Sequence, residues 1–219
     1  MHDLSSEIPT PITYLITSGE LSAQDDFART IDLIRRAVES GVSLIQIREK
    51  NLPARRLYEL SCRAAEITNR SATRLLINDR ADIARAAGAD GVHLTSHSLK
   101  ADVIRQAFGP DLLIGVSTHS LVEAGEARDA GADFVVFGPI FETPSKSIYG
   151  SPLGVECLRE VVQALRSFPV IALGGITLDN FAQALEAGAS GIAAIRLFTA
   201  AKDLRAVIES ITHHKPARP

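Results

Sequence analysis

The chain contains no tryptophan, and aromatic residues make up only 5% of its 219 positions. A protein that stacks bases or sugars needs exposed aromatic rings, so we expect no such stacking platform. Neither sign of charge prevails, because 23 lysines and arginines stand against 26 aspartates and glutamates, a net charge of −3. Non-specific binding to nucleic acid depends on a strong basic excess, so we expect no nucleic-acid partner.

Cysteine is also scarce, and Cys62 and Cys157 lie far apart in helix-like segments. We expect them to be free, buried or half-buried thiols of a reducing compartment. No stretch approaches 18 consecutive apolar residues, and the start of the chain has neither the basic nor the apolar region of a signal peptide. The sequence therefore predicts a cytoplasmic protein with no membrane partner.

One junction recurs four times along the chain: an alanine-rich segment, a glycine, a polar step and a short apolar run. The glycines are Gly41, Gly88, Gly131 and Gly188, separated by 47, 43 and 57 residues. A left-handed glycine often ends a helix, and a short β-branched run is typical of a buried parallel strand. A βα unit of an eightfold barrel takes about 25 residues, so each interval holds about two units.

This spacing predicts eight strands that alternate with helices over residues 12–212, between an N-terminal extension (1–11) and a C-terminal tail (213–219). The expected strands are Ile12–Thr17, Ser43–Arg48, Arg74–Asn78, Gly91–Leu94, Leu112–Ser117, Phe134–Gly138, Pro169–Leu173 and Gly191–Arg196. The expected helices are Asp26–Glu39, Pro53–Thr68, Asp82–Ala87, Leu99–Phe108, Ser120–Ala130, Leu153–Ser167, Leu178–Ala187 and Ala200–Ile211. Strict alternation favours a single-domain (β/α)8 TIM barrel of the α/β class. A doubly wound open sheet is the alternative, but no GxGxxG follows the first strand.

Polar residues gather where the predicted strands end, which is where (β/α)8 barrels keep their chemistry. In the second strand, alternation places Gln46, Arg48 and Lys50 on the face that points into the barrel. Cations there need an anion or a polar network, and a structural layer of salt bridges is the alternative. Asp79 follows the third strand beside Asn78, and its carboxylate suits Mg²⁺ shared with a substrate phosphate. Capping the next helix is the alternative role of Asp79.

The fourth and fifth strands end in histidine and serine. We interpret His93 as a hydrogen-bonded core residue and His97 as exposed, because two histidines without a carboxylate make a poor zinc site. Ser117 ends the fifth strand, at the predicted mouth of the barrel.

The loop over residues 139–152 is the longest that the pattern predicts. It carries Thr143, Ser145 and Lys146, which suit phosphate capture or a closing lid. An ordinary polar loop is the alternative.

A second anion-binding corner is predicted after the last two strands. Gly174 and Gly175 precede a helix, where backbone N–H groups can approach an anion. Arg196 follows Ile195 at the end of the eighth strand, where barrels often hold phosphate. We therefore predict an enzyme whose two corners bind phosphate groups on two substrates.

The segments now described resemble the thiamine-phosphate synthase family in order and approximate spacing, over about residues 12–200. They are Gln46-Ile-Arg48-Glu-Lys50, Leu76-Ile-Asn78-Asp79-Arg80, Gly88-Ala-Asp-Gly-Val-His93-Leu94, Gly115-Val-Ser117-Thr-His119, Gly138-Pro-Ile-Phe-Glu-Thr143-Pro-Ser145-Lys146 and Leu173-Gly174-Gly175-Ile176.

The resemblance implies a (β/α)8 barrel that joins a hydroxymethylpyrimidine diphosphate to a thiazole phosphate, giving thiamine phosphate and pyrophosphate. It implies Mg²⁺ on Asp79 and a catalytic set of Arg48, Lys50, Ser117 and Lys146. The residues implied to hold the pyrimidine diphosphate are Gln46, Arg48, Lys50, Asn78, Ser117 and Lys146. Those implied for the thiazole phosphate are Thr143, Ser145, Gly174, Gly175, Ile195 and Arg196. The family resemblance also allows a homodimer.

Two positions depart from the family pattern. Ser98 stands where a second metal-binding acid is usual, and Arg196 where a small hydroxyl residue is common. Several segments also look like the sister branch of thiazole tautomerases, although the proposed acid–base histidine of that branch would fall at Pro139. A tautomerase, or a non-catalytic regulatory protein that binds a phosphate ligand, is therefore the alternative to a synthase.

Overall fold

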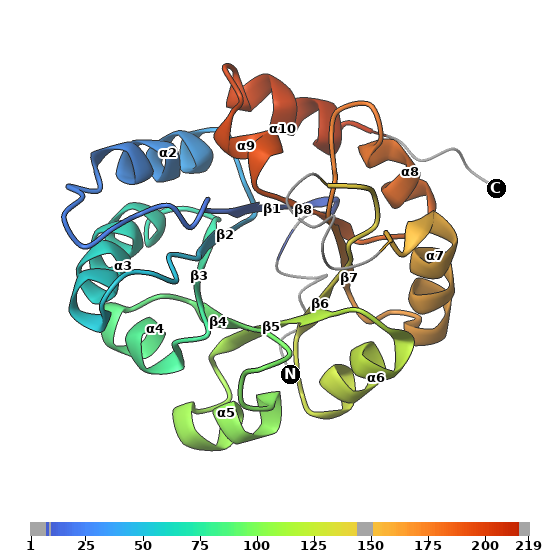
Figure 1. The fold of residues 1–219 in the computed structure, drawn as a ribbon, viewed down its shortest axis with the longest axis horizontal. Helices are drawn as coiled ribbons and strands as arrows, with labels where there is room; N and C mark the ends of the chain where they lie inside the picture. The colour runs from blue at the N-terminus through green and yellow to red at the C-terminus, as the bar shows by residue number, and fades with distance from the viewer. Residues whose placement is uncertain (1–7, 9, 144–150, 215–219) are drawn as a thin grey trace.

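The computed structural model describes residues 8, 10–143 and 151–214, and its eight parallel strands close into a barrel in sequence order (Figure 1). Every strand pairs with its neighbours along the chain, and β8 pairs with β1 to close the ring. The strands are β1 (Ile12–Ile16), β2 (Leu44–Ile47), β3 (Arg74–Asn78), β4 (Gly91–Leu94), β5 (Leu113–Thr118), β6 (Phe134–Phe137), β7 (Val170–Leu173) and β8 (Gly191–Ala194). The predicted (β/α)8 barrel is therefore confirmed.

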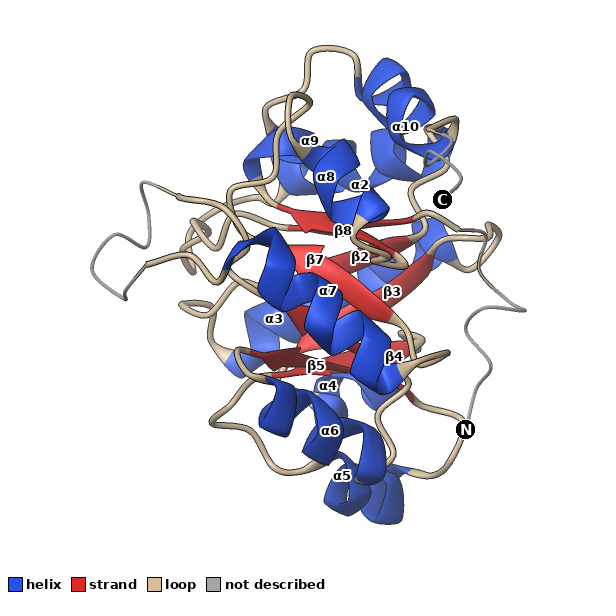
Figure 2. Ribbon diagram, turned by 90° about the vertical axis from the view of Figure 1, so that its right-hand side faces the viewer, coloured by secondary structure: helices blue, strands red, loops and turns tan. Residues whose placement is uncertain are grey.

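The helices form an outer ring around the strands (Figures 1 and 2). They are α2 (Ala28–Glu39), α3 (Ala54–Thr68), α4 (Ala81–Ala87), α5 (Ala101–Phe108), α6 (Leu121–Asp129), α7 (Gly154–Leu165), α8 (Phe181–Glu186), α9 (Arg196–Thr199) and α10 (Leu204–Thr212). Because every crossover is a helix packed outside the sheet, the strands are buried on both faces and read as short apolar runs. The carboxyl ends of all eight strands then open toward one end of the barrel.

Alternation along the strands separates two apolar clusters. The larger one fills the layer between strands and helices and contains Ile45 and Ile47 of β2. The smaller one fills the barrel itself and contains Tyr14, Leu76 and Phe134. Ile8 also packs into the inner cluster and is only 4% exposed. The alternation expected along the second strand is confirmed, since Ile45 and Ile47 lie on the face toward the helices.

Three predicted elements differ from the structure near the end of the chain. The last helix, α10, begins at Leu204 rather than Ala200. The eighth strand stops at Ala194, and Arg196 begins the four-residue helix α9, which the sequence pattern did not predict. Helix α8 begins at Phe181 rather than Leu178, because Asn180 Oδ1 accepts the N–H of Thr177 (2.8 Å) and holds the intervening residues in a turn. All three differences lie in the segments that follow β7 and β8.

Cys62 and Cys157 are free and half-buried, as expected. None of the helices in the described part of the chain is long and apolar enough to span a membrane.

Candidate active site

Three aromatic rings form the floor of the site inside the barrel. The ring centroids of Tyr14 (β1), His93 (β4) and Phe134 (β6) lie 5.7 to 6.3 Å from one another. Gly115 of β5 lies beneath them, and a Cβ there would stand 2.3 Å from Cζ of Phe134 and 2.9 Å from Nδ1 of His93. The missing side chain of Gly115 therefore gives these rings their space.

A chain of hydrogen bonds crosses this floor. Gln46 Nε2 donates to the hydroxyl of Tyr14 (2.8 Å), and that hydroxyl lies 3.2 Å from Nδ1 of His93. His93 Nε2 in turn lies 2.8 Å from Oγ of Ser117 at the half-buried end of β5. The expectations that Gln46 points into the barrel and that His93 is a hydrogen-bonded core residue are confirmed. The role of Tyr14 could not be predicted from its strand alone.

Burial keeps the two titratable members of this chain uncharged. Desolvation raises the pKa of Tyr14 far above its ordinary value. Burial, with a smaller contribution from the positive charge of Arg48, lowers the pKa of His93 to about 3. At neutral pH both rings are therefore neutral, and the imidazole carries a single proton.

The two cations of the second strand stand at the mouth of the barrel. The backbone N–H of half-buried Arg48 donates to Oγ1 of Thr17 (2.9 Å), while its guanidinium has no hydrogen-bond or ion-pair partner among the described residues. Lys50 lies beyond the end of β2 and is exposed. The alternative of a structural salt-bridge layer at Arg48 is therefore not observed in the described part of the molecule.

The acid between these cations, Glu49, was not singled out by the sequence. It is only 3% exposed, and its carboxylate accepts the backbone N–H groups of Gly19 (3.2 Å) and Leu21 (3.0 Å). These bonds anchor the loop between β1 and α2 at the mouth. Its position one residue after an inward-facing cation was the signal that could have identified it.

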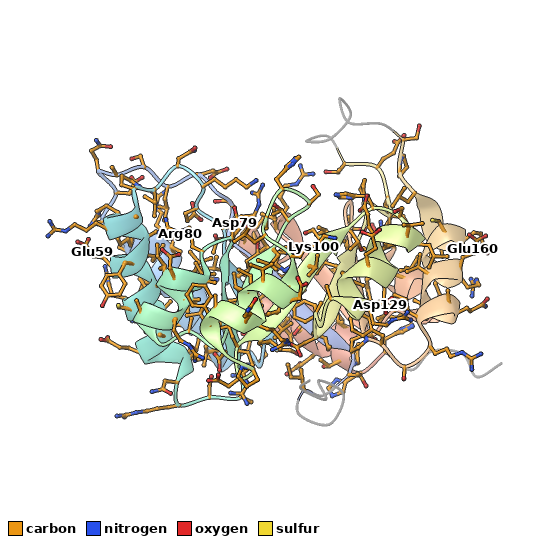
Figure 3. The ribbon with its side chains drawn as sticks, turned by 90° about the horizontal axis from the view of Figure 1, so that it is seen from below. Glu59, Asp79, Arg80, Lys100, Asp129 and Glu160 are labelled. Carbon is orange, nitrogen blue, oxygen red and sulfur yellow. The ribbon has the colours of Figure 1, made fainter. Side chains whose placement is uncertain are left out.

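Asp79 stands directly after β3 with an exposed side chain (Figure 3). Its backbone has φ +61° and donates an N–H bond to the carbonyl oxygen of His93 (2.8 Å). The residue that caps α4 is Arg80, which pairs with Asp82, so the alternative role of Asp79 as a helix cap is wrong. The carboxylate of Asp79 makes no hydrogen bond within the described ranges. Asn78 ends β3 half-buried, paired in register with His93.

Ser98, which replaces the expected second acid, is occupied by its own loop. Its hydroxyl accepts the N–H of Thr95 (2.7 Å) and lies 3.1 Å from Oγ1 of Thr95. His97 is exposed, as expected. In the ranges that the structure describes, no three His, Cys, Asp or Glu side chains gather around a common point that could hold a metal. A metal here would therefore depend on Asp79 and on oxygens of a ligand.

The second predicted corner brings together the ends of β6 and β8. Nη2 of Arg196, the first residue of α9, donates to Oγ1 of Thr143 (3.4 Å). Arg196 is exposed, whereas Thr143 and Ile195 are half-buried. Ser145 and Lys146 lie outside the described residues.

Gly174 and Gly175 follow β7 with φ values of +100° and +65°. A Cβ on Gly174 would stand 2.6 Å from Cα of Pro139, and one on Gly175 would stand 2.4 Å from the carbonyl oxygen of Glu142. These glycines therefore let the loop after β7 lie against the segment after β6. The helix that follows them begins at Phe181 instead of the expected Leu178, since the turn that ends at Asn180 intervenes.

The comparisons with known proteins decide the family. A family model described as thiamine monophosphate synthase matches residues 13–198. The chain belongs to this family. A putative thiamine-phosphate synthase of Geobacter sulfurreducens is 45% identical over 192 residues, covering 88% of each chain. The thiamine-phosphate synthase of Moorella thermoacetica is 42% identical over 177 residues, covering 81% of this chain and 84% of the relative. The solved thiamine phosphate pyrophosphorylase of Pyrococcus furiosus superposes with a TM-score of 0.78 at 34% identity, covering 91% and 93% of the two chains.

This member of the thiamine monophosphate synthase family has a proline where the tautomerase branch is expected to carry its acid–base histidine. Pro139 follows Gly138 in a cis peptide bond, and Nδ1 of His119 bonds to the carbonyl oxygen of Gly138 (2.5 Å). His119, which follows β5, is therefore near this position, although Pro139 itself cannot transfer a proton.

Proposed function

We propose that this chain is a thiamine-phosphate synthase, which joins a hydroxymethylpyrimidine diphosphate to a thiazole phosphate and releases pyrophosphate. The observation that carries the proposal is its likeness to thiamine-phosphate synthases at 45% and 42% identity over more than four-fifths of either chain. The guanidinium of Arg48 supports the proposal, because it lies at the mouth of the barrel and has no hydrogen-bond or ion-pair partner among the described residues. We place the enzyme in the cytoplasm, acting on small molecules, and the family resemblance allows a homodimer.

In this reaction the bond between the pyrimidine methylene and the diphosphate breaks, and the thiazole nitrogen forms the new bond to the methylene. The leaving diphosphate gains negative charge as the bond breaks, so positive charge placed around it lowers the barrier. Arg48, Lys50 and Lys146 are proposed to supply that charge, while Gln46 and Asn78 hold the pyrimidine. Ser117 contacts the leaving group or the pyrimidine.

The donor set at Asp79 fits Mg²⁺. This ion is usually held by one or two carboxylates together with substrate phosphates and water, and the Asp79 carboxylate makes no hydrogen bond in the described ranges. With Ser98 committed to Thr95, Asp79 is the one protein carboxylate we assign to the ion, and oxygens of the diphosphate complete its shell. When bound, the ion neutralises charge on the leaving diphosphate.

The corner after β6, β7 and β8 is proposed to take the thiazole phosphate. Barrels often hold phosphate in the loops after the seventh and eighth strands, beside a short extra helix, and α9 occupies that place. The guanidinium of Arg196, the first residue of α9, suits a phosphate because this planar group can donate hydrogen bonds to two oxygens at once. The residues assigned to this subsite are Thr143, Ser145, Gly174, Gly175, Ile195 and Arg196.

The test is a synthesis assay with purified protein, both substrates and Mg²⁺, in which each component is omitted in turn. Thiamine phosphate should appear only when both substrates are present. Arg48→Ala and Lys146→Ala should each abolish turnover, whereas Arg55→Ala, whose side chain is 89% exposed on α3, serves as the matched control and should retain it. Normal turnover in the Arg48 or Lys146 variant would remove that residue from the site.

Two further experiments test the assignment of Mg²⁺ to Asp79 and the tautomerase alternative. Asp79→Asn keeps the size and the positive φ of the residue, so a loss of Mg²⁺-dependent turnover would report the lost charge. Turnover unaffected by chelator or by Asp79→Asn would exclude Mg²⁺ on Asp79. Isomerisation of a thiazole carboxylate phosphate without any pyrimidine diphosphate, and no synthesis with it, would identify the chain as a tautomerase.

A further inference from the structure

The hydrogen-bond chain on the barrel floor has a direction that follows from counting its protons. The amide nitrogen of Gln46 donates to the hydroxyl oxygen of Tyr14, so Tyr14 must give its own proton elsewhere. The other partner of that hydroxyl among the described residues is Nδ1 of His93. A neutral imidazole that accepts at Nδ1 carries its proton on Nε2 and donates it to Ser117. The hydroxyl oxygen of Ser117 therefore accepts a hydrogen bond from Nε2 of His93. Its own proton is then free to be donated to a group at the mouth of the barrel.

With the amide nitrogen of Gln46 toward Tyr14, the opposite direction would leave a buried donor unpaired; with the amide oxygen there, the direction would reverse. If Ser117 donated to His93, Nδ1 of the imidazole would donate to the oxygen of Tyr14, which already accepts from Gln46. The proton of Tyr14 would then have no acceptor among the described residues, although this side chain is fully buried. An unpaired buried donor loses its hydration without compensation, which disfavours this arrangement.

The residues packed around this hydrogen-bond chain hold its side chains in place. Phe134 is fully buried and lies edge-on to Tyr14, with an interplanar angle of 78°. His93 and Phe134 pack so closely over Gly115 that a Cβ there would stand 2.9 Å from Nδ1 of His93 and 2.3 Å from Cζ of Phe134. The hydroxyl of Ser117, half-buried at the end of β5, is the one member of the chain at the mouth.

We infer that Tyr14 and His93 are positioning residues that act through Ser117, holding its hydroxyl proton toward the mouth as a fixed hydrogen-bond donor to the substrate. The inference deepens the proposed function and rests on it for its kinetic consequence. The acceptor we assign is an anionic oxygen of the diphosphate, because the guanidinium of Arg48, two residues after Gln46 on the inward face of the second strand, has no hydrogen-bond or ion-pair partner among the described residues. A donor fixed before the substrate arrives needs no reorganisation when charge develops on that oxygen.

The direction of the chain can be read without any activity. In nitrogen–proton correlation spectra of the ¹⁵N-labelled full-length protein at neutral pH, the ring proton of His93 should be on Nε2. The signal is assigned by its absence from His93→Gln. A proton on Nδ1 would overturn the inference whatever the enzyme catalyses.

The kinetic test is a double-mutant cycle on the synthesis reaction. Tyr14→Phe removes one hydroxyl from the chain, Ser117→Ala removes the donor itself, and each should lower kcat/KM about tenfold. The double variant should be no slower than Ser117→Ala, because Tyr14 acts only through Ser117. Tyr58→Phe, the same change on an exposed tyrosine, is the control. A double variant about a hundredfold slower than wild type would contradict the inference.

A rescue experiment separates positioning from simple packing. His93→Gln can place an amide N–H where Nε2 stands, and should retain kcat/KM within a few-fold of the wild type. His93→Leu fills the space without a donor and should match Ser117→Ala. Equal losses in the glutamine and leucine variants, with thermal unfolding showing both folded, would refute a positioning role. If the wild-type protein makes no thiamine phosphate, the proposed function fails, while the spectra still decide the direction of the chain.

Discussion

Gly115 provides the sharpest test of how the floor of the site is packed. An alanine there would place its Cβ 2.3 Å from Cζ of Phe134 and 2.9 Å from Nδ1 of His93, both parts of rigid rings. Atoms cannot approach this closely, so the rings must move apart inside a closed barrel. Overpacking of a well-packed core typically costs about 1–3 kcal/mol. For a chain of about 200 residues, each kcal/mol lowers the melting temperature by about 2–4 °C.

Gly125 is the matched control, because the same substitution should have the opposite sign. It lies inside α6, and an ideal Cβ there meets nothing within 4 Å. Glycine in the interior of a helix costs about 1 kcal/mol relative to alanine. Gly125→Ala should therefore raise the melting temperature by about 2–4 °C, whereas Gly115→Ala should lower it.

The assay is thermal unfolding of the wild type and both variants, followed by circular dichroism at one protein concentration. Gly115→Ala should also lose synthesis activity below its melting temperature, since its Cβ displaces His93 from Ser117. A Gly115→Ala protein that melts at or above the wild-type temperature, with full activity, would show that the rings are not packed as described. A lower melting temperature in both variants would mean that Gly125 does not have the open space described for its Cβ.

Three further predictions concern buried polar groups. The pKa of His93 is about 3 in the folded chain against an ordinary 6.5, so only the unfolded chain takes up this proton as the pH falls between these values. The free energy of unfolding should therefore decrease toward acid, by up to about 1.4 kcal/mol per pH unit from this group. His93→Gln should flatten that slope in urea titrations at pH 4 to 7, and an equal slope in both proteins would contradict the shift. Asp133 is fully buried, 2.6 Å from the guanidinium of Arg105, so Asp133→Asn should cost about 3–5 kcal/mol in urea; a loss below about 1 kcal/mol would refute the pairing. Glu49→Gln removes an acceptor from the loop between β1 and α2, which should speed hydrogen exchange of its two bonded amides, and unchanged exchange would exclude the anchor.

The parts of the fold that the sequence predicted best are those governed by alternation and burial. The bounds of β3 and β4 agree residue for residue with the expected strands. Both are short apolar runs between a glycine or polar turn and a polar end, because parallel barrel strands are buried on both faces. In β2 the alternation also placed Gln46 inside the barrel and Ile45 outside it.

The parts that the sequence did not predict depend on local hydrogen bonds rather than on periodicity. Helix α9 has four residues, Arg196–Thr199, too few to show a helical repeat. The start of α8 depends on the Asn180 side chain, which bonds both the N–H of Thr177 and the carbonyl oxygen of Gly175. The periodicity of apolar residues does not predict such side-chain hydrogen bonds. Both elements therefore had to be seen in three dimensions.

The candidate site was predictable as a set of strand ends but not as a network. Inward-facing positions could be read from each strand, whereas the partners come from strands far apart in sequence. Tyr14 and His93 are 79 residues apart and meet only because the barrel closes. Asp79 was correctly placed at the mouth, but its positive φ, which frees the carboxylate from the helix cap, has no signature in the sequence.

The electrostatics of the floor favour a transfer reaction over one that depends on proton transfer from this floor. A general acid or base works best when its pKa is near the operating pH, whereas burial holds the pKa of His93 at about 3 and raises that of Tyr14. These groups therefore serve as fixed dipoles rather than as proton carriers. The charge at the mouth is cationic at Arg48 and Lys50, with Glu49 turned into its loop. A reaction that expels a diphosphate needs fixed dipoles and cations, and needs no base at the reacting carbon.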